Sequence, residues 1–288
     1  MYVLLVATLG RDDLVLTASS VGCPPFPTLI EAAVRGGFAA LSLWPPETYG
    51  AALEAGYDGE QLCRMLDDAG VVAHEVDALV AWAGANDPGE PYLRAAPRAF
   101  VLETAAALGA GQANAIVVGE RGTSHEAIAE VVDAMCEEAA ALGVRVGIEF
   151  ARGSLVSTVD DYLAVRALLP SREVGVTVDA WQIHWGPSTL DDLARVRGAA
   201  VFCVQIDDAP AERPDDFARA TYEGRLVPGA GAADLTGLIR TLDAIGYDGP
   251  ITVEAINADL IATTDAVELA VLLGNATRQV VAAARARS

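Results

Sequence analysis

Short apolar runs alternate along the chain with stretches whose apolar residues recur at helical spacing, a pattern typical of repeated β–α units. We expect strands at residues 2–8, 38–44, 71–79, 113–118, 144–150, 174–181, 199–206 and 250–256. We expect helices at residues 28–35, 58–69, 97–108, 124–143, 158–169, 190–196, 234–245 and 265–284, with the one that begins at Ser124 the longest, and a long loop at residues 209–231.

The number and spacing of these pairs predict the fold class. Eight pairs in 288 residues allow about 36 residues for each, which is the size of the unit in a (β/α)₈ TIM barrel. A doubly wound open sheet is the alternative, but the turn after the first predicted strand reads LGRDDL and lacks a glycine-rich dinucleotide fingerprint. We therefore expect residues 1–288 to form a single TIM-barrel domain.

Oxygen-bearing side chains stand near the ends of four successive predicted strands. Any one of them alone is explained equally well by a buried ion pair or a satisfied polar group. Four at the same end of consecutive parallel strands point instead to a site for one divalent cation at the mouth of the barrel. The four are Glu149, Asp179, Gln205 and Glu254. Because all four donate oxygen, we expect Mn²⁺ or Mg²⁺ rather than Zn²⁺ or Co²⁺.

The acidic composition excludes some partners. The chain has 40 acidic against 19 basic residues and a formal net charge of −21, which repels nucleic acid and anionic membrane surfaces. Its four cysteines have no CxxC spacing, and the N-terminus lacks the basic region of a signal peptide. We expect a cytoplasmic protein with reduced thiols, no membrane span, and a small-molecule substrate.

Histidine and aromatic side chains near the predicted strand ends are candidates for substrate contacts. His184 follows Asp179 in DAWQIHWGP, between Trp181 and Trp185. His74 lies inside the third predicted strand and either faces the mouth or belongs to the core. The tryptophans either form an apolar wall for a polyol or simply pack in the loop. Trp44, Tyr49 and Trp82 follow strands two and three and are further wall candidates.

Several motifs carry a resemblance to a known family. VGIEF, VDAW, VQIDDAP, GRLVPGAG and DLTGLIRTLDAIGYDGPITVE, between residues 143 and 260, resemble the sugar phosphate isomerase/epimerase superfamily of xylose isomerase-like TIM barrels. That family includes hydroxypyruvate isomerase, ketose 3-epimerases, inosose dehydratase and 3-dehydroshikimate dehydratase. Its metal ligands are a glutamate, an aspartate, a histidine or glutamine, and a glutamate on strands five to eight. The resemblance assigns these roles to Glu149, Asp179, Gln205 and Glu254, and it is compatible with a homodimer or homotetramer.

Near the expected substrate site, this sequence departs from the family pattern at two residues and matches it at a third. Gln182 stands where many relatives have a histidine, and Ala230 replaces the acid of the usual PGEG loop. Arg225 matches a family arginine near the substrate; the alternative is a surface arginine paired with Glu223 or Asp208. The candidate substrate-binding residues are His184, Arg225, Trp181, Gln182 and His74.

The resemblance implies metal-assisted proton transfer beside a carbonyl, with Glu149 and Glu254 as base and acid. The predicted function is isomerisation or epimerisation of a sugar, polyol ketone or small keto-acid. A dehydratase of the inosose or 3-dehydroshikimate type is the alternative, because the same groups serve loss of a β-hydroxyl. A non-catalytic sugar-binding or partner subunit is the alternative of another class. The apurinic endonuclease branch uses a histidine-rich trinuclear zinc site, which three histidines and a charge of −21 disfavour.

Overall fold

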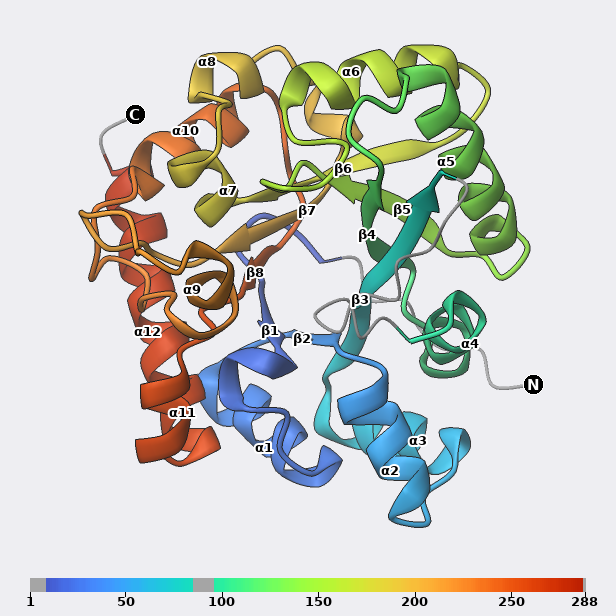
Figure 1. Ribbon diagram of the computed structural model, residues 1–288. Helices are drawn as coiled ribbons and strands as arrows, with labels where there is room; N and C mark the ends of the chain where they lie inside the picture. The colour runs from blue at the N-terminus through green and yellow to red at the C-terminus, as the bar shows by residue number, and fades with distance from the viewer. Residues whose placement is uncertain (1–8, 85–95, 287–288) are drawn as a thin grey trace.

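The computed structural model describes residues 9–84 and 96–286, and its eight strands close into one parallel barrel in chain order (Figure 1). Each strand pairs with its neighbours in sequence, and β1 pairs with β8 to close the ring. The predicted (β/α)₈ barrel is confirmed. The strands are β1 Leu14–Thr17, β2 Ala40–Leu43, β3 Val72–Ala83, β4 Gln112–Gly119, β5 Arg145–Glu149, β6 Val174–Asp179, β7 Val201–Ile206 and β8 Ile251–Val253.

Helices surround the barrel and pack their apolar faces against it (Figure 1). The α-helices are α1 Phe26–Gly36, α2 Ala51–Glu54, α3 Gly59–Ala69, α4 Arg98–Leu108, α5 His125–Ala140, α6 Val159–Leu168, α7 Ala180–Trp185, α8 Leu190–Leu193, α9 Phe217–Glu223, α10 Leu235–Ala244, α11 Ala258–Thr263 and α12 Ala266–Arg285. Three further helical turns are η1 Ala18–Val21, η2 Pro46–Gly50 and η3 Gly198–Ala200. Within the described residues, no helix has both the length and the apolar character needed to cross a bilayer.

The strand predicted at residues 2–8 lies outside the described residues. Among the described residues, the first strand of the barrel is the four-residue β1. All four of its side chains are buried, and its backbone pairs with both β2 and β8. So short an apolar run, placed directly after two acidic residues, gives a weaker local signal than the longer run before it.

Three other predictions about the elements differ from the structure. β6 ends at Asp179, and Trp181 belongs to α7 rather than to the strand. The loop predicted at residues 209–231 contains α9. The longest described helix is α12, with 20 residues, rather than α5, with 16.

Capping residues fix where the outer helices begin and end. Asp58 and Gln61 form reciprocal side-chain to backbone bonds at the start of α3, and Thr158 and Asp161 do so at α6. Gly70 ends α3 with φ of 66°, a left-handed conformation that glycine adopts without a steric cost. These caps set the direction of the chain as it enters and leaves the strands.

An aromatic ring packs inside the barrel near the amino ends of the strands, which we call its lower end. Phe202 of β7 reaches over Gly175 of β6, where an added Cβ would lie 2.2 Å from the ring. The guanidinium of Arg145 covers the same ring, 4.4 Å from its centre. Glycine at residue 175 is therefore required by the close approach of the aromatic ring.

Candidate functional site

The four predicted oxygen donors lie at the same end of the barrel. Glu149 and Asp179 are the last residues of β5 and β6, Gln205 is the penultimate residue of β7, and Glu254 directly follows β8. Asp179 and Gln205 are paired across adjacent strands. All four are buried, with Asp179 and Gln205 fully so. The sequence pattern placed them correctly at the carboxyl ends of the strands.

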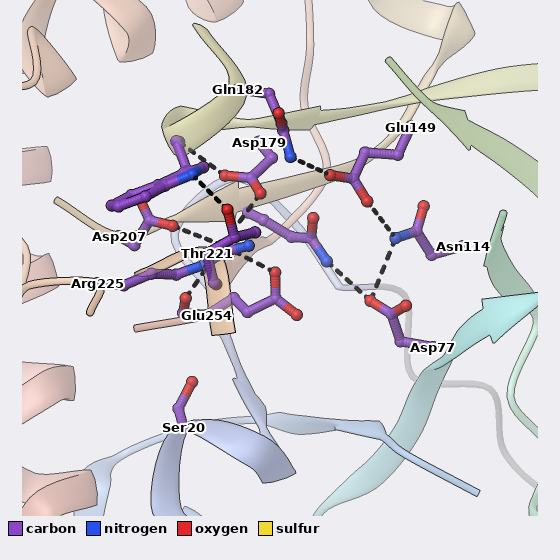
Figure 2. Close-up of polar contacts among 12 residues, drawn as sticks. Ser20, Asp77, Asn114, Glu149, Asp179, Gln182, Asp207, Thr221, Arg225 and Glu254 are labelled. Atoms are coloured by element: carbon purple, nitrogen blue, oxygen red, sulfur yellow. Dashed lines mark hydrogen bonds and ion pairs between the residues drawn. The ribbon is translucent and has the colours of Figure 1, made fainter. Parts of the chain in front are cut away.

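Arg225 connects three carboxylates at this end (Figure 2). Its Nη1 lies 3.0 Å from both Asp179 Oδ2 and Glu254 Oε2, and 2.5 Å from Asp207 Oδ2. Its Nε donates to the backbone oxygen of Thr221 at 2.9 Å. The side chain is buried, so the alternative of a surface arginine paired with Glu223 or Asp208 was wrong.

Asp208 has a separate, structural role in the loop that holds Arg225. Its carboxylate accepts hydrogen bonds from the backbone nitrogens of Gly229, Gly231 and Ala233 at 2.9 to 3.0 Å. The loop around Ala230 is therefore held by its backbone, without an acidic side chain at that residue.

Neutral amides, rather than arginine, hold Glu149. Asn114 Nδ2 donates to Glu149 Oε2 at 3.2 Å, and Gln182 Nε2 donates to Glu149 Oε1 at 3.1 Å. Gln182 in turn accepts from the backbone nitrogen of Arg152 at 2.9 Å. Gln182 is thus brought into the site as a partner of Glu149.

Asp77 of β3 was missed by sequence reasoning, and it shares the Asn114 amide with Glu149 (Figure 2). Its Oδ2 accepts from Asn114 Nδ2 at 3.2 Å and from Gln205 Nε2 at 3.0 Å. Asp207, also missed, is the third partner of Arg225. We call the set of Asp77, Asn114, Glu149, Asp179, Gln205, Asp207, Arg225 and Glu254 the carboxylate cluster.

Five carboxylates and one guanidinium make the carboxylate cluster electrostatically unbalanced. Burial, reinforced by the negative charge of Asp179, raises the pKa of Glu149 to about 8. Burial likewise raises the pKa of Asp77 to about 6, and it raises the pKa values of Asp207 and Glu254 well above their ordinary range. A buried anion is stabilised by a proton or by a cation, so the carboxylate cluster favours binding one or the other.

The donor atoms suit a hard divalent cation. Among the described residues, Gln205 Oε1 and Asp207 Oδ1 are buried oxygens with no hydrogen-bond partner, and Asp179 Oδ2 is paired with the Arg225 guanidinium. Carboxylate and amide oxygens are the ligands that Mg²⁺ and Mn²⁺ prefer. Within the described part of the chain, however, no three His, Cys, Asp or Glu side chains are already arranged as a metal site. Arg225 contacts Asp179 and Glu254, while Glu149 faces amides, so the donor set fits a cation and needs side-chain adjustment to surround it.

Trp181 packs against the cover of the site and does not offer an open wall. Its ring is fully buried, 5.7 Å from the ring of Phe217 and 6.3 Å from that of Trp185. Its indole nitrogen donates to Thr221 Oγ1 at 3.2 Å. Trp181 therefore fastens α9, the helix that leads into Arg225, onto the end of β6.

The two candidate histidines are not brought to the carboxylate cluster. His184 lines a separate cavity of about 320 Å³ beside α8 and α10, with its ring against Trp185. His74 lies near the amino end of β3 and lines a cavity of about 470 Å³ at the opposite end of the barrel. Its ring contacts the Gln112 amide at 3.2 Å. His74 lies near the amino end of its strand and so does not face the mouth, whereas a substrate contact of His184 stays a prediction.

Comparison with known proteins establishes the family. The family profile described as xylose isomerase-like TIM barrel matches residues 30–276, so the chain belongs to that family. The resemblance inferred from the motifs is confirmed at this level.

Individual relatives are more distant. An inosose isomerase of Bacillus licheniformis is 31% identical over 127 residues, which are 43% of this chain and 45% of that protein. A 3-dehydroshikimate dehydratase of Pseudomonas aeruginosa is 28% identical over 131 residues, 45% of this chain and 20% of that protein. The chain thus spans about half the length, or less, of these relatives. The crystal structure of the IOLI protein with a zinc atom has a TM-score of 0.80 at 20% identity, covering 94% of this chain and 98% of that chain, which shows a shared fold.

Proposed function

We propose that the protein is a divalent-cation-dependent isomerase or epimerase that moves a proton beside the carbonyl of a neutral polyhydroxylated ketone. The observation that carries the proposal is the carboxylate cluster. It holds five carboxylates and one guanidinium, which contacts three of them, and the buried oxygens Gln205 Oε1 and Asp207 Oδ1 have no hydrogen-bond partner among the described residues. Membership in a family whose relatives include an inosose isomerase supports it.

Glu149, Asp179, Gln205 and Glu254 would hold the cation, and Mn²⁺ or Mg²⁺ suits their oxygens best. When bound, the cation stabilises negative charge that develops on the carbonyl oxygen of the substrate. The structural neighbour with a zinc atom makes Zn²⁺ a metal to include in the test.

Glu149 and Glu254 are the proposed proton carriers, and their surroundings differ. Glu149 is held by two neutral amides, and its raised pKa of about 8 lets it exchange a proton near neutral pH. Glu254 contacts the guanidinium of Arg225 at 3.0 Å, which favours its ionised form relative to burial alone. Unequal environments for two carboxyls provide one acid and one base in a single site.

The absence of lysine from the sequence narrows the chemistry. All 19 residues of the lysine and arginine class are arginine. A substrate carbonyl therefore cannot be activated as an iminium on a lysine of this chain. Electrophilic assistance must come from a cation or from hydrogen-bond donors, which agrees with the oxygen-rich cluster.

The charge of the site favours a neutral substrate. Arg225, the guanidinium within the cluster, already contacts three carboxylates. A phosphate or carboxylate on the substrate would add negative charge where carboxylates already exceed cations, at a considerable electrostatic cost. An inosose, which is a neutral cyclic polyol ketone, meets this requirement, and a small keto-acid meets it less well.

The test is solvent-deuterium exchange by protein stripped of metal and then reloaded. Neutral ketoses and inososes are incubated with Mn²⁺, Mg²⁺, Co²⁺ or Zn²⁺ in D₂O, and NMR records deuterium beside the carbonyl and any isomer formed. We expect exchange and isomerisation only with a cation present. Tight ligand binding without exchange under every metal would replace the proposal with a non-catalytic binding role.

Dehydration of a hydroxyketone is the second candidate, because a 3-dehydroshikimate dehydratase is among the relatives. Both reactions begin with removal of the same proton, and they part when a β-hydroxyl leaves. Appearance of enone absorbance, with loss of one water from the product mass, would favour dehydration. The negative charge of the carboxylate cluster weighs against 3-dehydroshikimate itself, which is a carboxylate.

A further inference from the structure

Gln205 is the neutral member of the four oxygen donors, and the direction of its amide decides which atom it offers. Its Nε2 donates to Asp77 Oδ2 at 3.0 Å. Its Oε1 is buried and has no hydrogen-bond partner among the described residues. A reversed amide would place Oε1 against the Asp77 carboxylate and present nitrogen to the carboxylate cluster. Hard cations bind amide oxygen, so the direction determines whether Gln205 can be a ligand.

The contact between Asp77 and Gln205 crosses the barrel. β3 and β7 lie on opposite sides of the eight-strand ring and do not pair with one another. The two residues are 128 positions apart in the chain. The contact is therefore made by side chains that meet in the interior, and it is not a by-product of strand pairing.

A second amide fixes Asp77. Asn114 Nδ2, from the neighbouring strand β4, donates to Asp77 Oδ2 at 3.2 Å and to Glu149 Oε2 at 3.2 Å. Both protons of this amide thus face carboxylates, as Figure 2 shows for Asp77, Asn114 and Glu149. Asp77 cannot turn away from Gln205 without also giving up the bond from Asn114.

We propose that Asp77 is a positioning residue that directs the nitrogen of Gln205 toward β3 and so leaves its oxygen as the donor atom for a bound cation. Asp77 itself is not placed among the ligands. The cation-binding part of this inference rests on the proposed function, whereas the direction of the amide does not.

The direction is tested first in metal-free protein. The side-chain amide of Gln205 is followed by ¹H–¹⁵N NMR and identified by its absence from Gln205→Ala. Because a charged acceptor makes the stronger hydrogen bond, Asp77→Asn should move this resonance upfield and speed its exchange with water. Glu75→Gln is the matched control, since it removes a carboxylate two residues earlier on β3 that does not contact Gln205. An unchanged Gln205 resonance in Asp77→Asn would overturn the proposal.

The consequence is tested by Mn²⁺ titration calorimetry. Asp77→Asn should weaken binding by about 10- to 100-fold, the usual effect of losing an orienting partner. In Gln205→Glu, both terminal atoms are oxygen, so adding Asp77→Asn should change affinity by about twofold or less. Glu75→Gln should also stay within about twofold.

The outcomes separate this inference from the proposed function. An equal loss from Asp77→Asn in both backgrounds would mean that only charge matters, and it would overturn the positioning role. If no variant binds a divalent cation, the proposed function fails. The amide resonance then still decides whether Asp77 directs Gln205.

Discussion

Two polar layers, two residues apart on the same strands, have opposite characters. In the lower layer, Glu75 accepts from Gln112 Nε2 and from Thr252 Oγ1, each at 3.0 Å. Gln112 Oε1 in turn accepts from Arg145 at 3.3 Å. In the upper layer, Asp77 and Asn114 occupy the equivalent places on β3 and β4. There the oxygens of Asn114 and Gln205 have no partner among the described residues.

The difference teaches how one barrel interior supplies both stability and a site. Side chains at i and i+2 of a strand share a face, so both layers point inward by the same rule. The lower layer satisfies its carboxylate with neutral donors and is closed by Phe202. The upper layer gathers more carboxylates than its single guanidinium can balance. Unsatisfied, charge-rich polar groups indicate function, whereas satisfied ones indicate packing.

The largest contrast should come from removing one carboxylate in each layer. Glu149→Gln should lower kcat by up to about 10⁴-fold, because a proton carrier is lost. Glu75→Gln should leave kcat within about twofold, since it lies outside the reacting groups. Steady-state kinetics with the substrate found by deuterium exchange measure both. Equal losses in the two variants would end the distinction between the layers.

Replacing one arginine in each layer should lower the unfolding free energy by very different amounts. Arg225→Met leaves Asp179, Asp207 and Glu254 without their guanidinium, and we expect a loss of about 3–5 kcal/mol in unfolding free energy. Arg145→Met should cost about 1 kcal/mol or less, because its side chain is half exposed. Urea unfolding in the presence of chelator measures both values.

Adding a cation gives a second comparison of the same two variants. Added Mn²⁺ should recover part of the stability that Arg225→Met loses, since it supplies positive charge to the same carboxylates. Because Mn²⁺ should stabilise Arg145→Met and wild type alike, the difference in stability between those two should not change. Recovery of neither variant, or of both alike, would contradict the assignment of the cation to the upper layer.

Stability should depend on pH through the upper layer. Glu149, with its pKa raised from 4.5 to about 8, binds its proton more tightly in the folded protein than in the unfolded chain. Its contribution is therefore full below about pH 4.5 and is lost as the pH rises through about 8. One such group gives at most about 1.4 kcal/mol per pH unit, or about 3–5 °C in Tm for a chain of this size. Asp77 acts in the same direction up to about pH 6.

The measurement is a series of thermal melts between pH 5 and pH 8 in chelator. Glu149→Gln should flatten the decline, and Glu75→Gln should not. Saturating Mn²⁺ should also flatten it, because a cation replaces the proton as the counter-charge. A Tm that rises with pH in the chelated wild type would contradict the raised pKa of Glu149.

The sequence alone predicted the barrel and the strand-end positions of four oxygen donors, because both follow from local patterns. Alternating β and α segments identify the fold, and Glu149 or Asp179 stands out as a charge at the end of an apolar run. Asp77 had a weaker signal. It lies within the run HEVDALV, where the alternation of Glu75 and Asp77 with apolar residues is also typical of a half-exposed strand.

The partners of those donors were not predictable from local pattern. Arg225 meets Asp207 18 residues away in the chain and Asp179 still farther, through a loop that Asp208 and Trp181 hold in place. His184 and His74 were placed by sequence proximity and strand membership, and neither decides which way a side chain faces or which end of a strand it occupies. Long-range side-chain contacts of this kind depend on the closed barrel and not on any one segment.

A change of one methyl group tests whether the lower layer is only packing. Gly175→Ala sets a methyl group against the Phe202 ring, and we expect a loss of about 1–3 kcal/mol in unfolding free energy. Because Phe202 lies below the strand ends, kcat and Mn²⁺ affinity of the folded variant should stay within about twofold of wild type. Adding Phe202→Leu should relieve the overlap and recover part of the stability, measured by urea unfolding. Loss of Mn²⁺ binding in folded Gly175→Ala would show instead that the lower layer positions the upper one, and the two would then have to be treated as a single site.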